Sequence, residues 1–119
     1  MTKSISYLAL ALVLPLTGGF FHNHLTKSTP SADETVKDSP TQIRLWFNEK
    51  PEASFSSVSV LTADSTKLDV VGKAHTTNDT LSVAADVTKP LTKGKYMIVW
   101  RTAGKDGHAV RGRFSFSVE

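Results

Sequence analysis

The sequence of 119 residues contains no cysteine. This absence excludes a disulfide scaffold, a cysteine-type zinc site, an iron–sulfur cluster, a thiol nucleophile and a blue-copper centre, because each of them needs a thiol or thiolate. The sequence also lacks a run of basic residues: its 14 Lys and Arg are scattered singly, so we expect no nucleic-acid binding. The apolar fraction of 39% suffices for one packed core and is too low for a protein with several membrane spans.

Residues 1–19 differ in composition from the rest of the sequence. Lys3 is their only charge, and a nearly continuous run of Ile, Leu, Ala and Val follows between Ile5 and Leu16. This run is shorter than the roughly 20 residues that cross a bilayer, and small residues come after it at positions 17–19. The pattern predicts a signal peptide over residues 1–21, cut after residue 19 or 21, and an exported domain over residues 22–119. An uncleaved anchor or a buried helix is the alternative.

Beyond residue 22 the hydrophobic pattern has a period of two, which is typical of half-buried strands. In residues 41–48, for example, Ile43, Leu45 and Phe47 occupy alternate positions, and Phe114 and Phe116 share one face of a later segment. The strands that we expect lie at residues 25–28, 41–48, 57–61, 68–71, 80–84, 95–102 and 110–118. We find no convincing helix. About seven short strands predict an all-β fold, an antiparallel Greek-key β-sandwich of the immunoglobulin-like or cupredoxin-like kind.

The candidate chemistry is concentrated in four histidines, His22, His24, His75 and His108. His108 ends the sequence Asp106-Gly107-His108, in a loop between the two best-defined strands. A glycine between the carboxylate and the imidazole lets the backbone turn tightly, so both groups can converge on one point. Taken alone this spacing is a weak signal, and a solvated turn is the simpler interpretation.

A histidine at the start of a mature chain can bind one metal ion through both its α-amine and its ring. An α-amine and an imidazole ordinarily release their protons near pH ~8 and ~6.5, respectively, so a metal ion displaces these protons at neutral pH. Because protons compete with the metal for the same nitrogens, the metal affinity falls as the pH falls. Two imidazoles, an amine and a carboxylate form an N₃O set that suits tetragonal Cu(II). Zinc could use the same ligands but prefers a tetrahedral arrangement.

Three stretches of the sequence carry a resemblance to a known family. They are HNHLTKSTPSADE (residues 22–34), SPTQIRLWFNEKPEASFSSVSV (39–60) and PLTKGKYMIVWRTAGKDGHAVRGRFSFSV (90–118). Their most specific parts are H-x-x-L-x-x-S-x-P, L-x-x-G-x-Y-x-V/I-x-W and D-x-H-x-x-x-G-x-x-x-F. In this order they resemble the CopC copper-resistance domains, which include the YobA-like proteins, over residues 22–119.

The resemblance implies a periplasmic Cu(II)-binding β-sandwich that acts as a carrier or buffer in copper homeostasis or resistance, and not as an enzyme. It implies His22, through amine and ring, together with Asp106 and His108, as the ligands. An inner-membrane copper transport protein would be its partner, and we expect a monomer. Glu49 matches an acidic position of the family, and we interpret it as a group outside the coordination sphere.

The sequence departs from the family pattern in two places. Some members carry a methionine-rich loop that binds Cu(I), whereas residues 61–79 contain no methionine, so we expect one Cu(II) site and no Cu(I) site. His75 lies in that stretch, and we interpret it as a solvated loop histidine. Cleavage after Phe21 would make His22 the first residue, but cleavage after Gly19 fits the small-residue rule better and would lose the amine. His24 would then be the natural substitute ligand, although we interpret it as a bystander.

Two other functions stay open at this point. A metal-free immunoglobulin-like interaction module would use Trp46 and Arg44, on the polar face of a strand, unless Trp46 packs under a neighbouring loop. A copper-dependent enzyme that oxidises polysaccharides also uses an N-terminal histidine with a second histidine. The short chain leaves little room for the long loops that such an enzyme needs.

Overall fold

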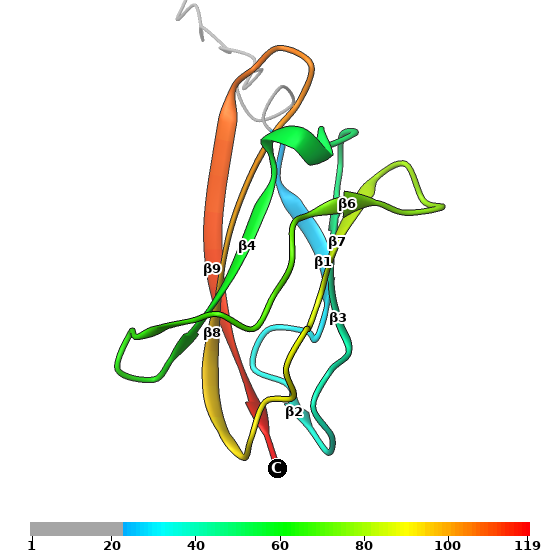
Figure 1. Ribbon diagram of the computed structural model, residues 1–119. Coiled ribbons are helices and arrows are strands. Elements are labelled where there is room, and N and C mark those ends of the chain that lie inside the picture. The colour runs from blue at the N-terminus through cyan, green and yellow to red at the C-terminus, as the bar shows by residue number, and fades with distance from the viewer. Residues whose placement is uncertain (1–22) are drawn as a thin grey trace, which may run out of the picture.

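The computed structural model describes residues 23–119; the predicted signal peptide and His22 lie outside the described residues. The described chain forms two sheets packed face to face (Figure 1). The four-stranded sheet has the order β1 (Leu25–Thr29), β3 (Gln42–Phe47), β7 (Ser82–Asp86), β6 (His75–Thr76). The five-stranded sheet has the order β2 (Thr35–Val36), β9 (Ala109–Val118), β8 (Gly94–Ala103), β4 (Ser57–Thr62), β5 (Lys67–Leu68).

The predicted β-sandwich is confirmed, and each of the seven expected strands overlaps an observed one. Two further strands, β2 and β6, have two residues each and are too short to produce a periodic pattern. The fold is not wholly antiparallel, because β2 pairs with β9 in parallel. Strand β7 begins at Ser82 rather than residue 80, since Asp79 forms a turn with Leu81 and Ser82.

The described part of the chain contains little helix. A single 3-10 turn, η2 (Ala53–Phe55), connects β3 to β4. No helix within residues 23–119 is long and apolar enough to cross a membrane. The expectation that the domain is built from strands therefore holds for the residues that the structure describes.

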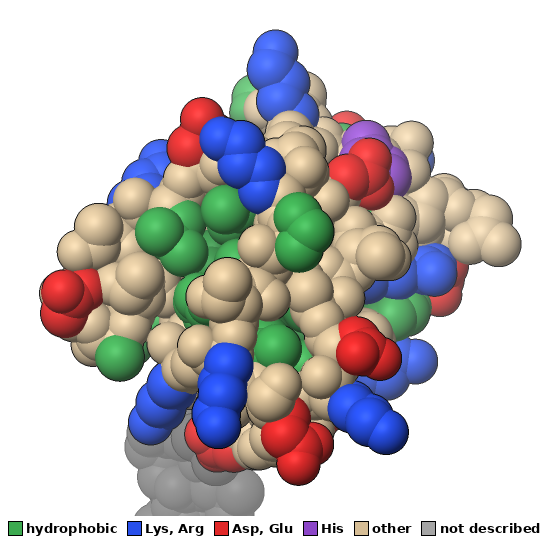
Figure 2. Space-filling model, turned by 60° about the horizontal axis from the view of Figure 1, so that its bottom comes forward, with side chains coloured by type: hydrophobic (Ala, Val, Ile, Leu, Met, Phe, Trp, Pro, Cys, Tyr) green, Lys and Arg blue, Asp and Glu red, His purple; other side chains and the backbone are tan. Residues whose placement is uncertain are grey.

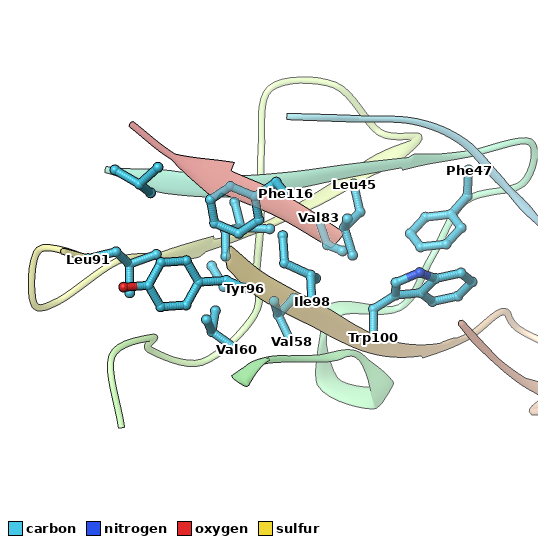
Figure 3. Packing of buried hydrophobic residues seen from close by; sticks show 13 residues of the cluster. Leu45, Phe47, Val58, Val60, Val83, Leu91, Tyr96, Ile98, Trp100 and Phe116 are labelled. Carbon is cyan, nitrogen blue, oxygen red and sulfur yellow. The ribbon is translucent and has the colours of Figure 1, made fainter. Parts of the chain in front are cut away.

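The core lies between the two sheets and is built from alternate residues of their strands (Figure 3). Phe47 of the four-stranded sheet meets Trp100 of the five-stranded sheet edge to face, with ring centroids 5.2 Å apart. Tyr96 stacks on Phe116, which is 1% exposed, at 5.8 Å. Phe114, the other expected core phenylalanine, is partly buried and packs against this cluster. Alternation along the strands thus places the large side chains where the sequence pattern predicts them.

Strands β8 and β9 form a long hairpin whose register depends on a glycine. Trp100 pairs with Gly112, and a Cβ atom built on Gly112 would lie 2.5 Å from Cζ2 of Trp100. No ordinary contact is that short, so the indole occupies the space that any side chain at position 112 would need. Glycine is required here for room rather than for its backbone conformation.

The surface combines apolar and charged side chains. From the lower end of the view in Figure 1, hydrophobic side chains gather in the middle and charged ones surround them (Figure 2). The opposite, upper end of the sandwich carries the start of β1, the end of β3, η2 and the β8–β9 loop (Figure 1). That upper end brings together segments from both halves of the described chain, and the loop with Asp106 and His108 belongs to it.

Candidate metal centre

The loop at residues 104–108 joins β8 to β9 and carries Asp106 and His108. Its backbone closes through a hydrogen bond of 3.0 Å from Gly107 N–H to the Gly104 carbonyl. Gly107 has φ +77°, in the left-handed region that favours glycine. The loop is therefore a tight turn at the tip of the long β8–β9 hairpin.

The turn brings the two predicted ligands together. Oδ2 of Asp106 lies 3.1 Å from Nδ1 of His108, and Oδ1 accepts a hydrogen bond of 3.1 Å from the His108 backbone N–H. The His108 side chain is 90% exposed and the Asp106 side chain 60% exposed. Nε2 of His108 has no hydrogen-bond partner among residues 23–119. An open carboxylate–imidazole pair with one unengaged ring nitrogen results, which is an arrangement suited to metal binding.

The start of the described chain is fixed at the same end of the sandwich. Oδ1 of Asn48 accepts a hydrogen bond of 2.6 Å from the His24 N–H, and the Asn48 N–H donates to the His24 carbonyl at 3.2 Å. Asn23 is buried, and its Oδ1 accepts a hydrogen bond of 3.3 Å from the Glu49 N–H. The backbone that enters β1 is thus tied to residues 48–49.

Residues 48–52 also contact the β8–β9 loop. The Glu52 N–H donates to the Ala103 carbonyl at 2.9 Å. The Lys50 carbonyl oxygen and Oδ1 of Asp106 both lie within 4 Å of the position that a Cβ atom would take on Gly104. One segment therefore holds both the entry to β1 and the base of the loop with Asp106 and His108. The residue after His22 is in this way anchored at the same end as the other two predicted ligands.

The described residues supply two of the three predicted ligands. Within residues 23–119 no group of three or more His, Asp or Glu side chains is close enough to hold a metal ion. His22, the third predicted ligand, lies outside the described residues. Nδ2 of Asn23 is buried with no hydrogen-bond partner within the described part of the chain.

The remaining candidate residues have other surroundings. Glu49 is exposed and contacts Asn23 through its backbone N–H, not its carboxylate. His75 is exposed but lies in β6 rather than in a loop, and both of its ring nitrogens are engaged. Its Nε2 lies 3.2 Å from Oδ1 of Asp86, and its Nδ1 lies 2.9 Å from the Thr76 carbonyl. These two acceptors raise the pKa of His75, the carbonyl more than the carboxylate.

Trp46 lies on the outer face of the four-stranded sheet and is half-buried. Its Nε1–H donates to Oδ2 of Asp79 at 3.1 Å, so the loop that precedes β7 covers it in part. The Lys27 ammonium and the Arg44 guanidinium lie 4.2 and 4.6 Å from its ring centroid. The Leu81 N–H, first, and then the Trp46 N–H and these cations hold the pKa of Asp79 below its ordinary value. The interpretation in which Trp46 packs under a loop fits better than a freely exposed contact residue.

Comparison of the sequence and the structure with known proteins identifies the family of this chain. The family model described as the CopC domain matches residues 25–119. The chain belongs to the CopC domain family. A crystal structure of CopC from Methylosinus trichosporium OB3b superposes with a TM-score of 0.74 and 31% identity, over 82% of this chain and 94% of that chain.

Two curated relatives extend the comparison. Copper resistance protein C from Xanthomonas campestris pv. juglandis is 32% identical over 115 residues, covering 92% of this chain and 90% of that protein. Copper transport protein CutJ from Bacillus subtilis is 28% identical over 96% of this chain, which spans only 21% of the length of CutJ. The resemblance inferred from the sequence motifs is thereby confirmed at the level of the family.

The Asn23 and Asn48 contacts that fix the entry to β1 were not predicted from the sequence. Both asparagines are ordinary polar residues in the sequence, and their roles depend on the pairing of Leu25 with Phe47. Asparagine side chains commonly bond to backbone groups at strand ends and turns. This general tendency does not identify the partner of either asparagine until the pairing of the strands is known.

Proposed function

We propose that this protein is an exported, periplasmic copper-binding protein with a single Cu(II) site formed by His22, Asp106 and His108. It acts as a carrier or buffer in copper homeostasis or resistance and not as an enzyme, and it exchanges copper with an inner-membrane transport protein. The observation that carries the proposal is the exposed Asp106–His108 pair at the end of the sandwich where residue 23 enters β1. Family membership and relatives named for copper resistance and copper transport support it.

The geometry of the loop suits metal binding in either of two ways. Two donors bound about 2 Å from one ion at right angles are themselves about 2.9 Å apart, close to the 3.1 Å between Oδ2 and Nδ1. Alternatively Nε2 binds the ion while the carboxylate orients the ring through Nδ1–H. In both cases the carboxylate and the imidazole act as a unit, and a third donor near residue 23 completes the set.

Soft-metal binding is not part of the proposal. The sequence has two methionines, Met1 and Met97, and Met97 lies half-buried within β8. Cu(I) prefers several thioether or thiolate ligands, and the described residues offer no such cluster. We therefore assign the protein to Cu(II), for which imidazole, amine and carboxylate are suitable ligands.

The decisive experiment is a Cu(II) titration of the processed protein, with the first residue identified by intact mass. We expect one tight equivalent of Cu(II), and His108→Ala should lower the affinity by on the order of a hundredfold or more. The matched control is His75→Ala, which removes the other exposed histidine that is paired with an aspartate and should leave the affinity unchanged.

The alternatives give different results in the same experiment. A protein that binds no Cu(II), or binds it equally well after His108→Ala, would contradict the proposed site and favour a metal-free interaction module. Copper-dependent oxidation of a polysaccharide would contradict the carrier role. A mature chain that begins at Phe20 would keep the side-chain ligands but remove the amine of His22 from the set.

A further inference from the structure

The outer face of the five-stranded sheet carries five cations, which we call the basic face: Lys67, Lys95, Arg101, Arg111 and Arg113. All five side chains are exposed. Their strands place alternate residues in the core, as Tyr96, Ile98 and Trp100 show for β8. The cations therefore project from one face, on three of the five strands of the sheet.

No negative charge within these strands balances the basic face. The segments that form β2, β4, β5, β8 and β9 contain no aspartate or glutamate. The guanidinium groups of Arg101, Arg111 and Arg113 have no ion pair or hydrogen bond with any residue of the described chain. By contrast, the cations of the other sheet, Lys27 and Arg44, pack on Trp46 near Asp79.

The arrangement of the arginines opposes folding rather than assisting it. Arg101 pairs directly with Arg111 across β8 and β9, and Arg113 follows Arg111 on the same face. Like charges directly opposite each other on a sheet are destabilising. A neutral or acidic residue at either position would relieve the repulsion, so the cluster is better explained by an anionic partner than by the stability of the domain.

The basic face is a charged surface without the aromatic anchor residues of a typical protein interface. Between the cations lie half-buried aliphatic side chains, Leu61, Met97 and Val99. No Trp, Tyr or Phe projects from the outer side of these strands, although Trp and Tyr dominate the energetic centres of protein interfaces. Recognition would depend on charge spread over a broad area. Arginine binds phosphate groups through two parallel hydrogen bonds.

We infer that the basic face docks on the surface of a bilayer containing anionic phospholipids. The negative charge of such a surface is continuous and attracts each nearby Lys or Arg. Arg101 and Arg111 lie close to the hairpin end, where Ala103 pairs with Ala109 and the loop of Asp106 and His108 begins. Docking would hold that loop at the edge of the contact. The inference does not depend on copper binding.

The test is co-sedimentation of the processed protein with vesicles. Vesicles of phosphatidylglycerol and phosphatidylcholine in equal parts should bind the protein at low ionic strength, and vesicles of phosphatidylcholine alone should not. Salt at ~0.5 M should release it, since exposed charges are then screened. The triple variant Arg101→Ser, Arg111→Ser, Arg113→Ser should bind the anionic vesicles on the order of a hundredfold more weakly.

A variant with the same change in charge separates this face from net charge alone. Lys37→Ser, Lys73→Ser and Lys89→Ser remove three exposed cations that lie outside the strands of this sheet, and together they should leave most of the binding intact. Equal losses in both triple variants would overturn the inference, as would absence of binding to the anionic vesicles. Binding to polyglutamate but not to vesicles would also overturn it, in favour of an acidic protein. A cooperative thermal unfolding transition, at or above the temperature of the unaltered protein, shows that each variant is folded.

Discussion

Residues 23–119 contain two exposed histidine–aspartate pairs, with nearly the same distance between the paired atoms, that differ in what they can bind. Asp106 and His108 are 3.1 Å apart within one loop, whereas His75 and Asp86 are 3.2 Å apart across strands β6 and β7. In the strand pair both ring nitrogens are occupied, one by a carboxylate and the other by the Thr76 carbonyl. In the loop pair Nε2 is unengaged among the described residues.

The difference teaches that a histidine beside a carboxylate is a metal ligand only if a ring nitrogen keeps its lone pair. Two acceptors around His75 favour the doubly protonated ring, which has no lone pair to offer, and they raise its pKa. The pairing that stabilises His75 in its strand therefore weakens it as a ligand. The loop pair holds its ring through one nitrogen and leaves the other available.

The largest expected effect comes from the hydrophobic core, because both pairs form only in the folded domain. Phe116→Ala should lower the free energy of unfolding by about 3–5 kcal/mol, because this side chain is fully buried between the sheets. Denaturant unfolding measures the change. Phe55→Ala is the matched control, since Phe55 is 55% exposed and its loss should cost less than about 0.5 kcal/mol. Equal losses in the two variants would contradict the placement of Phe116 in the core.

Changing the carboxylates one at a time would sharpen the comparison. Asp106→Asn should weaken Cu(II) binding by about 10–100-fold, because the carboxylate either binds the ion or orients the imidazole that does. Asp86→Asn, the same change in the strand pair, should leave the affinity unchanged. Calorimetric titration of both variants gives the answer, and a weaker affinity in Asp86→Asn alone would reverse the assignment of the two pairs.

A substitution in the turn would test whether the loop pair depends on its backbone. Gly107→Ala forces a side chain into the left-handed region and should cost about 1 kcal/mol of unfolding free energy, although the space around it is open. It should also weaken Cu(II) binding. Gly72→Ala is the control, because Gly72 donates its N–H to the Asp86 carbonyl and a Cβ atom there meets only ordinary contacts. Unchanged stability and affinity in Gly107→Ala would show that the turn is not required.

The smallest effect concerns the pH dependence of the strand pair. The pKa of His75 is raised above 6.5, so its interactions stabilise the fold fully below 6.5 and are lost as the pH rises through the raised value. The pKa of Asp86 is lowered below 3.8, first by Gln42 and then by His75, so its contribution is present above 3.8 and is lost as the pH falls through the lowered value. The pair therefore stabilises the fold most between pH 3.8 and pH 6.5, where both contributions are fully present.

Asp86→Asn should lower the pKa of His75 only in part, because the hydrogen bond to the Thr76 carbonyl, which is the largest single cause of the raised pKa, remains. An NMR titration of the His75 ring protons measures this shift. Asp106→Asn should leave the titration of His75 unchanged. An unaltered His75 titration in Asp86→Asn would mean that the carboxylate does not contact the ring in solution.

The longer strands could be predicted because the alternation of apolar and polar residues, together with β-branched residues, indicates which side of each strand is buried. Ile43, Leu45 and Phe47 are all at most 1% exposed, as their spacing predicts. Strands β2 and β6 could not be predicted, since two residues carry no period and each forms only because a longer neighbour offers an edge.

The candidate site could be predicted in part, for a related reason. The loop pair is local, and the spacing of Asp106, Gly107 and His108 is visible in the sequence. The pairing of His75 with Asp86 spans 11 residues and requires the register of β6 against β7. The anchoring of Asn23 on Glu49 spans 26 residues and requires the register of β1 against β3. Contacts that depend on strand register do not leave a pattern along the chain.

The close packing of Trp100 on Gly112 fixes the register of the β8–β9 hairpin, which ends in the loop of Asp106 and His108. A slip of one residue would bring Arg111 or Arg113 into the place of Gly112, where the indole leaves no room for a side chain. It would also turn the buried face of the shifted strand outward. The packing of Trp100 on Gly112 thus disfavours every hairpin with a shifted register. In this way it also sets the number of residues in the turn that carries Asp106 and His108.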